Sequence, residues 1–275
     1  MMTQSDEYQK CFSEDAAAIT SILRLCESGT DKAKKYACLM VALLASDSSN
    51  QKLLGRTQGL LPALVDLAND DELSDECRAN VAWALGSLAN ENDENRCSIG
   101  RIPEAPNALV KIASCPSEEA RERAAYCIAE VVRDNDDNKL LLGSTEGSVA
   151  ALVHICATGS DPGKEQAAWA LAMLAENSGD NCDSIVLTPF ALEALLDMIS
   201  SPDDEGDTDK IASANALYAI AELARSGPGN RAAIVDTEGM LEALQLVSSS
   251  DIPGHQVAQW ALDQLLSDYD DDETR

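Results

Sequence analysis

Apolar residues recur along this chain with the spacing of amphipathic helices, and one helical pattern returns several times. The segments AWALGSLA around Leu85 and WALAMLA around Leu171 are nearly identical. Self-similarity at a period of about 43 residues is the signature of a repeat protein. One interval is longer, because the acidic residues 200–210 are predicted to form an extended loop. With Leu85 as the marker, the positions equivalent to it in the other copies are Val41, Ile128, Leu171, Ile220 and Leu262.

Two further patterns keep the same register. In the first, an Asn that suits the start of a helix is followed one turn later by an aliphatic residue; it occurs at Asn50, Asn95, Asn138, Asn181 and Asn230. In the second, a segment that reads ALV or a close variant begins at Ser21, Ala63, Ala108, Ala151, Ala194 and Ala243. A helix break usually precedes this segment, as at Gly59, Gly147, Pro189 and Gly239.

Each repeat is therefore predicted to contain a short Asn-led helix, a Gly or Pro break, a second helix, an acidic loop and a longer third helix. No β-type alternation competes with this interpretation. The predicted fold is all-α, an α-solenoid of about six repeats whose stacked units share one continuous core. We expect a single domain over residues 16–267, an N-terminal segment at 1–15 and an acidic, disordered tail at 268–275. The approximate repeat bounds are 16–47 (without a first helix), 48–91, 92–134, 135–177, 178–226 and 227–267.

The third helix separates an apolar face from a face that carries a bulky ring. At about 100° per residue, Val81, Ala82, Leu88 and Ala89 fall on the same side as Leu85 and form the predicted core stripe. Trp83 points almost the opposite way, together with polar neighbours such as Asn80 and Ser87. The residues that occupy this slot in successive repeats are Leu39, Trp83, Tyr126, Trp169, Tyr218 and Trp260.

Charge narrows the range of partners. The 275-residue chain has a formal net charge of −28 and a hydrophobic content of 45%. Such a chain repels phosphate backbones and anionic lipid, which argues against nucleic acid and membrane insertion and is compatible with basic partners. The nine cysteines are scattered without a C-x-x-C spacing, as is ordinary for reduced thiols. We expect a cytoplasmic or nuclear protein without a targeting segment.

The repeat resembles the armadillo family. The segment ENRCSIGRIPEAPNALVKIASCPSEEARERAAYCIAEVV is similar to an armadillo unit nearly from end to end. HEAT repeats are the nearest rival, but they have two helices in each unit and lack the Asn-led first helix. The resemblance implies that the third helices line a concave groove, and armadillo proteins serve adhesion, signalling, transport and ubiquitination alike.

Within that family, the Trp residues in a W-A-L-x-x-L context are similar to those of importin-alpha proteins. In importin-alpha the residue four positions after each Trp is characteristically Asn. The corresponding residues in this chain are Leu43, Ser87, Glu130, Met173, Glu222 and Gln264, none of which is Asn. The chain also has no basic arm for binding importin-beta, and it lacks the strongly basic groove of beta-catenin.

The leading hypothesis is a non-enzymatic scaffold or adaptor that binds an extended protein segment with basic residues along this groove. A carboxylate beside a ring suits a Lys or Arg side chain. Alternatively, each ring packs against the next third helix and only stiffens the solenoid. The predicted groove residues are Asn80, Trp83, Ser87, Tyr126, Glu130, Trp169, Tyr218, Glu222, Trp260 and Gln264.

Two other functions remain open. One is a structural subunit held in a larger assembly by its convex face or loops, with residues 200–210 as the candidate contact. The weaker one is an importin-alpha-like transport receptor. The partner and the oligomeric state are not specified by the sequence.

Catalytic and metal-binding patterns are missing. The two histidines, His154 and His255, lie far apart in the sequence, and His154 is expected to be a packed or boundary residue. The segment from Asp134 begins like an EF-hand, but Lys139 and Thr145 occupy the positions that need Gly and Glu. Phosphate-binding and nucleophile-elbow motifs are absent from the sequence as well. The prediction is a protein without catalytic residues, metal or cofactor.

Overall fold

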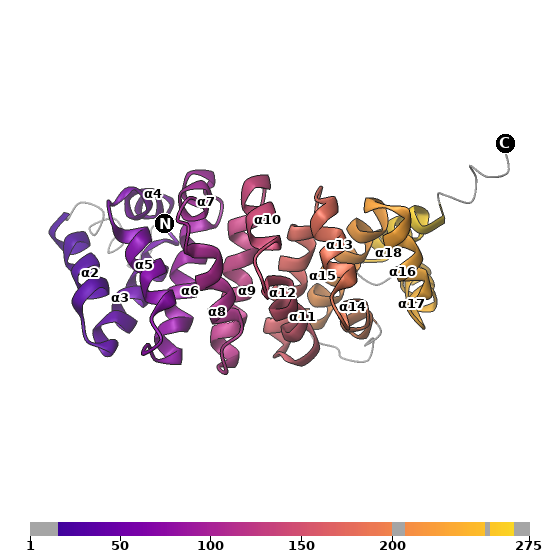
Figure 1. Ribbon diagram of the computed structural model, residues 1–275, viewed down its shortest axis with the longest axis horizontal. Helices are drawn as coiled ribbons and strands as arrows, with labels where there is room; N and C mark the ends of the chain where they lie inside the picture. The colour runs from indigo at the N-terminus through magenta and orange to yellow at the C-terminus, as the bar shows by residue number, and fades with distance from the viewer. Residues whose placement is uncertain (1–15, 200–206, 251–253, 267–275) are drawn as a thin grey trace, which may run out of the picture. The chain divides into compact units, whose positions relative to one another are not determined.

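A computed structural model describes residues 16–199, 207–250 and 254–266. Every regular element in these ranges is an α-helix (Figure 1). The chain divides into two compact bodies, residues 1–141 and 142–275, and each is described by itself. The predicted N-terminal segment 1–15 and the acidic tail 268–275 lie outside the described residues.

The helices of the N-terminal body alternate between short, intermediate and long. The first two described are α2 (Ala16–Ser28) and α3 (Asp31–Leu44). Two triplets follow: α4 (Ser48–Arg56), α5 (Leu60–Asn69) and α6 (Asp75–Ala89), then α7 (Asp93–Gly100), α8 (Ala105–Ala113) and α9 (Glu118–Val132). The boundary between the two bodies falls within α10 (Asp136–Gly143).

The C-terminal body continues the same order of helices. It contains α11 (Ser148–Thr158) and α12 (Asp161–Ala175), followed by α13 (Gly179–Leu187), α14 (Ala191–Ile199) and α15 (Asp207–Ser226). The last triplet is α16 (Pro228–Asp236), α17 (Met240–Ser248) and α18 (His255–Leu266). Three helices in each repeat, as the sequence predicts, distinguish this fold from a HEAT solenoid.

Local sequence explains where the third helices begin. Thr30, Ser74, Ser117 and Ser160 occupy the N-cap positions of α3, α6, α9 and α12, and each side chain accepts a hydrogen bond from a backbone N–H of the first turn. A hydroxyl at this position satisfies a donor that the helix itself leaves unpaired. The acidic residues that follow, such as Asp75 and Glu118, suit the positive end of the helix dipole.

Third helices form the core of both bodies by packing on one another. In the N-terminal body α3 packs on α6 and α6 packs on α9; in the C-terminal body α12 packs on α15 and α15 packs on α18. The predicted core stripe of α6 is confirmed, because Val81, Ala82, Leu85, Leu88 and Ala89 are completely buried. Burying each Leu side chain stabilises the fold by about 2 kcal/mol, and the intervening alanines let the helices approach closely.

The Asn residues that recur once in each repeat lie inside the first turn of the short helices. They are not the N-cap residues of these helices. The cap of α7 is Asn92, whose Oδ1 accepts a hydrogen bond from the backbone N–H of Asn95 at 3.0 Å. The buried Asn95 amide donates instead to two carbonyls, Leu88 O at 2.7 Å and Gln51 O at 3.2 Å. The expectation that Asn95 serves as a cap is therefore wrong: its side chain joins α7 to the end of α6 and to α4.

The same arrangement recurs along the chain. Asn138 Nδ2 donates to Val131 O at 2.8 Å and to Arg96 O at 3.0 Å. Each of these Asn side chains lies directly against a glycine of the preceding short helix, Gly55 for Asn95 and Gly100 for Asn138. A Cβ atom at either glycine would collide with the amide, so the sequence pairs each of these two Asn residues with a residue that has no side chain.

The second helices α5, α11, α14 and α17 begin at a backbone corner with positive φ, whereas α8 follows Glu104 with φ of −84°. Gly59, Gly147 and Gly239 have φ between 80° and 90° and precede α5, α11 and α17. Glycine adopts this left-handed conformation without steric cost. Before α14 the corner residue is Phe190, with φ of 64° and an exposed ring, directly after the Pro189 predicted as the break. Phe190 is thus a strained exception to the glycine rule.

The predicted acidic loop is shorter than the sequence suggests. Residues 200–206 lie outside the described residues, but α15 already begins at Asp207. The last four residues of the predicted loop, up to Lys210, are helical, and the prediction is wrong there. Part of the extra length of this repeat lengthens the helix: α15 has 20 residues, whereas α6, α9 and α12 have 15 each.

Candidate partner-binding surface

The predicted rings lie on the third helices and are half-buried in both bodies. Trp83 is on α6 and Tyr126 on α9 in the N-terminal body. Trp169, Tyr218 and Trp260 are on α12, α15 and α18 in the C-terminal body. None of these rings is fully buried, so each keeps some surface for another molecule.

The Trp83 ring already forms a cation–π contact with an Arg of the same chain. The Arg123 guanidinium of α9 lies over the indole, 4.6 Å from the ring centroid. Arg123 is held there by a 2.7 Å hydrogen bond to Asn80 Oδ1 and by a 2.6 Å ion pair with Glu119. A contact of this kind contributes about 1 kcal/mol. The sequence placed Asn80 on the outward face, but its side chain is 6% exposed and also donates to Lys35 O at 3.2 Å.

Tyr126 packs against a glycine of the neighbouring third helix. A Cβ atom at Gly86 would lie only 2.7 Å from Cε1 of Tyr126, so the edge of this ring fills the space that a side chain on α6 would need. Burial is the main cause that raises the pKa of the Tyr126 hydroxyl. Gly86 was not singled out from the sequence, because a glycine inside a helix gives no sign of which neighbour it accommodates.

Two rings of the C-terminal body touch each other. The centroids of Tyr218 and Trp260 are 5.9 Å apart and the ring planes are tilted by 36°. The Tyr218 hydroxyl donates to Glu176 Oε1 at 3.2 Å. Burial, followed by the charge of Glu176, raises the pKa of Tyr218 to about 12. These ring–ring and ring–helix contacts support the alternative that the aromatic residues stiffen the stack.

The two predicted groove carboxylates are paired within the chain. Glu130 is 3% exposed and its Oε2 lies 2.8 Å from an Arg133 guanidinium nitrogen. Glu222 is 4% exposed and forms the equivalent pair with Arg225 at 2.6 Å. The expectation that these carboxylates face the groove beside their rings, ready for a basic side chain of a partner, is not met. Each of these two carboxylates instead pairs with the Arg three residues later on the same helix.

Ser87 and Gln264, the remaining predicted residues, are half-exposed. The Ser87 carbonyl accepts a 2.9 Å hydrogen bond from Gln51 Nε2, which ties α6 to α4. The predicted groove residues therefore lie on the third helices as expected, although Asn80, Glu130 and Glu222 are buried there. Whether the rings bind a partner stays a prediction.

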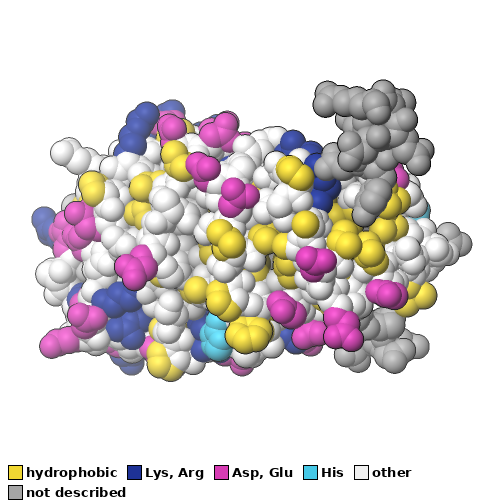
Figure 2. All heavy atoms as spheres, turned by 45° about the vertical axis from the view of Figure 1, so that its right-hand side comes forward, with side chains coloured by type: hydrophobic (Ala, Val, Ile, Leu, Met, Phe, Trp, Pro, Cys, Tyr) yellow, Lys and Arg dark blue, Asp and Glu magenta, His cyan; other side chains and the backbone are white. Residues whose placement is uncertain are grey.

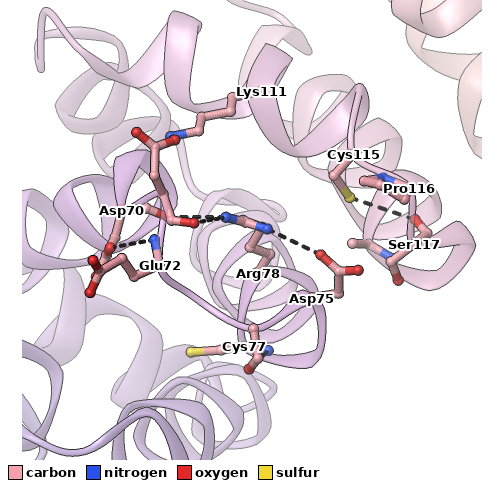
Figure 3. Close-up of polar contacts among 12 residues, drawn as sticks. Asp70, Glu72, Asp75, Cys77, Arg78, Lys111, Cys115, Pro116 and Ser117 are labelled. Carbon is pink, nitrogen blue, oxygen red and sulfur yellow. Dashed lines mark hydrogen bonds and ion pairs between the residues drawn. The ribbon is translucent and has the colours of Figure 1, made fainter.

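A charged cluster that the sequence did not single out lies where α5 leads into α6 (Figure 3). Asp71 pairs with Lys111 of α8 at 2.6 Å, and Asp70 pairs with Lys34 of α3 at 3.2 Å. The Arg78 side chain donates to the carbonyls of Asp70 and Asp71 and pairs with Asp75 at 3.1 Å. The ion pairs of this cluster link successive repeats, so the role of the cluster is structural. In the sequence, only the spacing of opposite charges about one repeat apart could have indicated these pairs.

Three further observations concern metal binding, the histidine His154 and membrane insertion. In the described part of the chain, no group of three His, Cys, Asp or Glu side chains is placed to hold a metal ion. His154 is exposed and contacts Thr158, so the expectation of a packed or boundary position is wrong. No single described helix is long and apolar enough to cross a membrane; only α10 and α11, taken together as a bent pair, pass that test of length and composition.

Comparison with known proteins finds similar solved structures but no match by sequence. No protein-family model matches the chain, and no curated protein matches it. Among solved structures, an engineered protein is 25% identical with a TM-score of 0.80, covering 90% of this chain and 96% of its own. A designed armadillo repeat protein in complex with the peptide (KR)4 is 24% identical with a TM-score of 0.74, covering 90% and 99%. The chain has the armadillo fold.

Part of a longer protein is similar in structure to almost all of this chain. UNC-45 from Drosophila melanogaster is 18% identical with a TM-score of 0.75, and the match covers 96% of this chain and 33% of that one. The predicted all-α solenoid is thus confirmed for this chain. One designed armadillo neighbour is in complex with a peptide and another was designed for modular peptide recognition; at this level of identity the likeness concerns the fold.

Proposed function

We propose that this armadillo chain is a non-enzymatic scaffold that binds an extended protein segment with basic residues along its third-helix faces. The observation that carries the proposal is the row of half-exposed rings on α6 and α9, and on α12, α15 and α18. Trp and Tyr bind well at such positions because they combine a large apolar area with a polar edge. The designed neighbour that binds (KR)4 supports an extended basic ligand.

The surface chemistry supports a basic ligand, although the binding carboxylates differ from the predicted ones. With Glu130 and Glu222 paired internally, the attraction comes from the overall charge of −28. Figure 2 shows Asp and Glu side chains spread among apolar side chains over the visible face. A field of this kind steers cationic ligands over distances longer than one contact, and the rings then fix their position.

A labelled (KR)4 peptide tests the proposal by fluorescence anisotropy. We expect Trp169→Ala to weaken binding about tenfold, as for a ring at the centre of an interface. Phe190→Gly is the matched control, because it removes an equally aromatic but distant exposed ring. A (KR)4 peptide of D-residues has the same charge and should bind less tightly than the L-peptide. Equal binding by the wild type and Trp169→Ala would reject the third-helix site.

A second function is favoured by one specific observation. At the corner between α13 and α14, Leu187 is 81% exposed and Phe190 is 73% exposed. Apolar side chains presented in this way are typical of protein contacts. They support the alternative of a subunit held in an assembly through its loops, with this corner as a contact in addition to the predicted residues 200–210. Replacing both by Ser should release the chain from its native complex in size-exclusion chromatography while peptide binding remains.

A further inference from the structure

Three cysteines from three helices meet in the interior of the N-terminal body. Cys26 lies near the end of α2, Cys38 in the middle of α3 and Cys77 in the first turn of α6. The Cys38 thiol is in hydrogen-bond contact with both Cys26 and Cys77. All three are free thiols and at most 1% exposed. Figure 3 shows the Cys77 side chain pointing away from the Arg78–Asp75 ion pair beside it.

Packing alone does not require sulfur at these positions. In the register of the repeat, the corresponding residues of the next repeat are Ala68, Ala82 and Ala120, and each of them is completely buried. The architecture therefore accepts an alanine in all three places. Only at this end of the described chain do three thiols replace the alanines and come into contact.

A surface cavity gives access to one end of the cluster. It has a volume of about 490 Å³, and Cys26 lies in its wall together with Lys34, Asp66 and Asp70. A small uncharged oxidant such as hydrogen peroxide fits easily into this volume, which is many times that of a water molecule. Cys38 and Cys77 do not line the cavity.

The hydrogen bond between the first two thiols makes them chemically different. The Cys38 thiol donates to the Cys26 sulfur, and this contact is the main cause that lowers the pKa of Cys26. The same contact is the main cause that raises the pKa of Cys38. Since the thiolate is the nucleophile in thiol oxidation, Cys26 is the member of the pair that reacts first.

We propose that Cys26 is a peroxide-oxidation site and that Cys38 is its resolving thiol. The Cys26 thiolate attacks one oxygen of hydrogen peroxide, the O–O bond breaks, and the departing hydroxide takes a proton to become water. Cys26 is then a sulfenic acid. The Cys38 sulfur attacks the Cys26 sulfur, the S–O bond breaks, and a second water leaves with the Cys38 proton. The product is a disulfide that joins α2 to α3.

The linkage has a direct structural consequence. α2 is the first described helix and packs on α3 and α5 within the body. A covalent bond to α3 prevents α2 from separating when the chain unfolds from this end. Oxidation should therefore raise the melting temperature of the wild-type chain.

Non-reducing peptide mapping of the full chain tests this inference. The reduced protein is exposed to hydrogen peroxide, remaining thiols are blocked with N-ethylmaleimide, and the digest is analysed by mass spectrometry. We expect the Cys26 and Cys38 peptides to be linked, with the loss of two hydrogens. In Cys38→Ala the linkage should vanish, and Cys26, which loses the contact that lowers its pKa, should form a sulfenic acid more slowly, to be trapped there by dimedone. Cys77→Ala should keep the linkage.

Cys97 provides an internal control, because it is half-exposed and lies outside the cluster. If Cys97 is oxidised while Cys26 and Cys38 stay reduced, or if Cys26 links mainly to Cys77 or Cys11, the proposal is overturned. The map of the unsubstituted chain decides the question even where a variant fails to fold. Far-ultraviolet circular dichroism checks the variants, whose alanines match those of the next repeat.

Discussion

At the scale of single residues, buried amides hold neighbouring repeats together. Asn95 donates to one carbonyl at the end of α6 and to another in α4, and Asn138 does the same for α9 and α7. The Leu88 and Val131 carbonyls lie in the last turns of α6 and α9, where the helix supplies no further N–H donor, so the Asn side chains supply it. Leaving such a group unsatisfied costs about 1–3 kcal/mol.

Asn95→Ala is therefore expected to lower the free energy of unfolding by about 2–4 kcal/mol, because it leaves the Leu88 carbonyl without a donor, removes the bond to α4 and leaves a small cavity. Urea denaturation followed by circular dichroism measures the change. Asn107→Ala, at an exposed position on α8, is the control and should alter stability by less than about 0.5 kcal/mol. A loss for Asn95→Ala as small as that of the control would contradict the role of the amide.

A second prediction at this scale concerns Glu130. Its burial raises the pKa of the carboxyl, and the nearby Arg133 offsets this only in part. Because the folded state holds the proton more tightly than the unfolded state, the stability that Glu130 contributes is present at acid pH and is lost as the pH rises through its folded pKa. Glu130→Gln has no proton to lose.

The difference in the free energy of unfolding, wild type minus Glu130→Gln, should consequently decrease as the pH rises above about 4, the ordinary pKa of a Glu carboxyl. Chemical denaturation at several pH values measures it. Glu118→Gln on the same helix is a matched control, since that carboxylate stays in water in both states. A difference that increases with pH would show that the ion pair with Arg133 outweighs burial.

At the scale of elements, a corner with positive φ turns the chain into four of the second helices, α5, α11, α14 and α17. Glycine with positive φ occupies it before α5, α11 and α17, and Phe190 occupies it before α14. A left-handed conformation costs a residue with a Cβ atom roughly 1–2 kcal/mol. The exposed Phe190 ring returns little of this cost through packing.

Phe190→Gly should raise the free energy of unfolding by about 0.5–1 kcal/mol, because the relief of strain exceeds the entropy that glycine adds to the unfolded chain. Thermal and urea unfolding measure it. Phe190→Ala keeps the strained backbone and should be nearly neutral, which separates the effect of φ from that of the ring. A loss of stability in Phe190→Gly would mean that the ring has a packing role.

Element types and core faces follow from periodicity, whereas polar partners do not. The pattern around Leu85 predicts the third helix and its buried stripe because the spacing of apolar residues within one helix is enough to identify the buried face. The fates of Glu130 and Asn95 depend on Arg133, on Leu88 and on the preceding repeat, which a helical wheel does not contain. The start of α15 was misplaced because acidic residues suit both a loop and the first turn of a helix.

At the scale of the whole molecule, the excess of acidic residues is the dominant property. The formal net charge is −28, and the ion pairs that the structure shows, such as Asp71 with Lys111, neutralise only a fraction of it. Mutual repulsion among the remaining carboxylates destabilises a compact chain. Salt shortens the range of this repulsion.

The melting temperature is therefore expected to rise when sodium chloride is increased from about 20 mM to about 0.5 M, since the Debye length falls several-fold over this range. Differential scanning calorimetry measures the shift. Glucose at matched osmolality is the control for effects unrelated to screening. A melting temperature that falls with salt would indicate that the inter-repeat ion pairs outweigh the repulsion.

The pairing of a buried Asn with a glycine, Gly55 with Asn95, Gly100 with Asn138 and Gly143 with Asn181, works as a connector with two complementary halves. A module that begins with one of these three Asn residues and is grafted into another array would dock only where its amide faces a residue without a Cβ atom. Engineers who wish to lengthen or shuffle the chain therefore have a splice rule: cut between the halves, and always restore both.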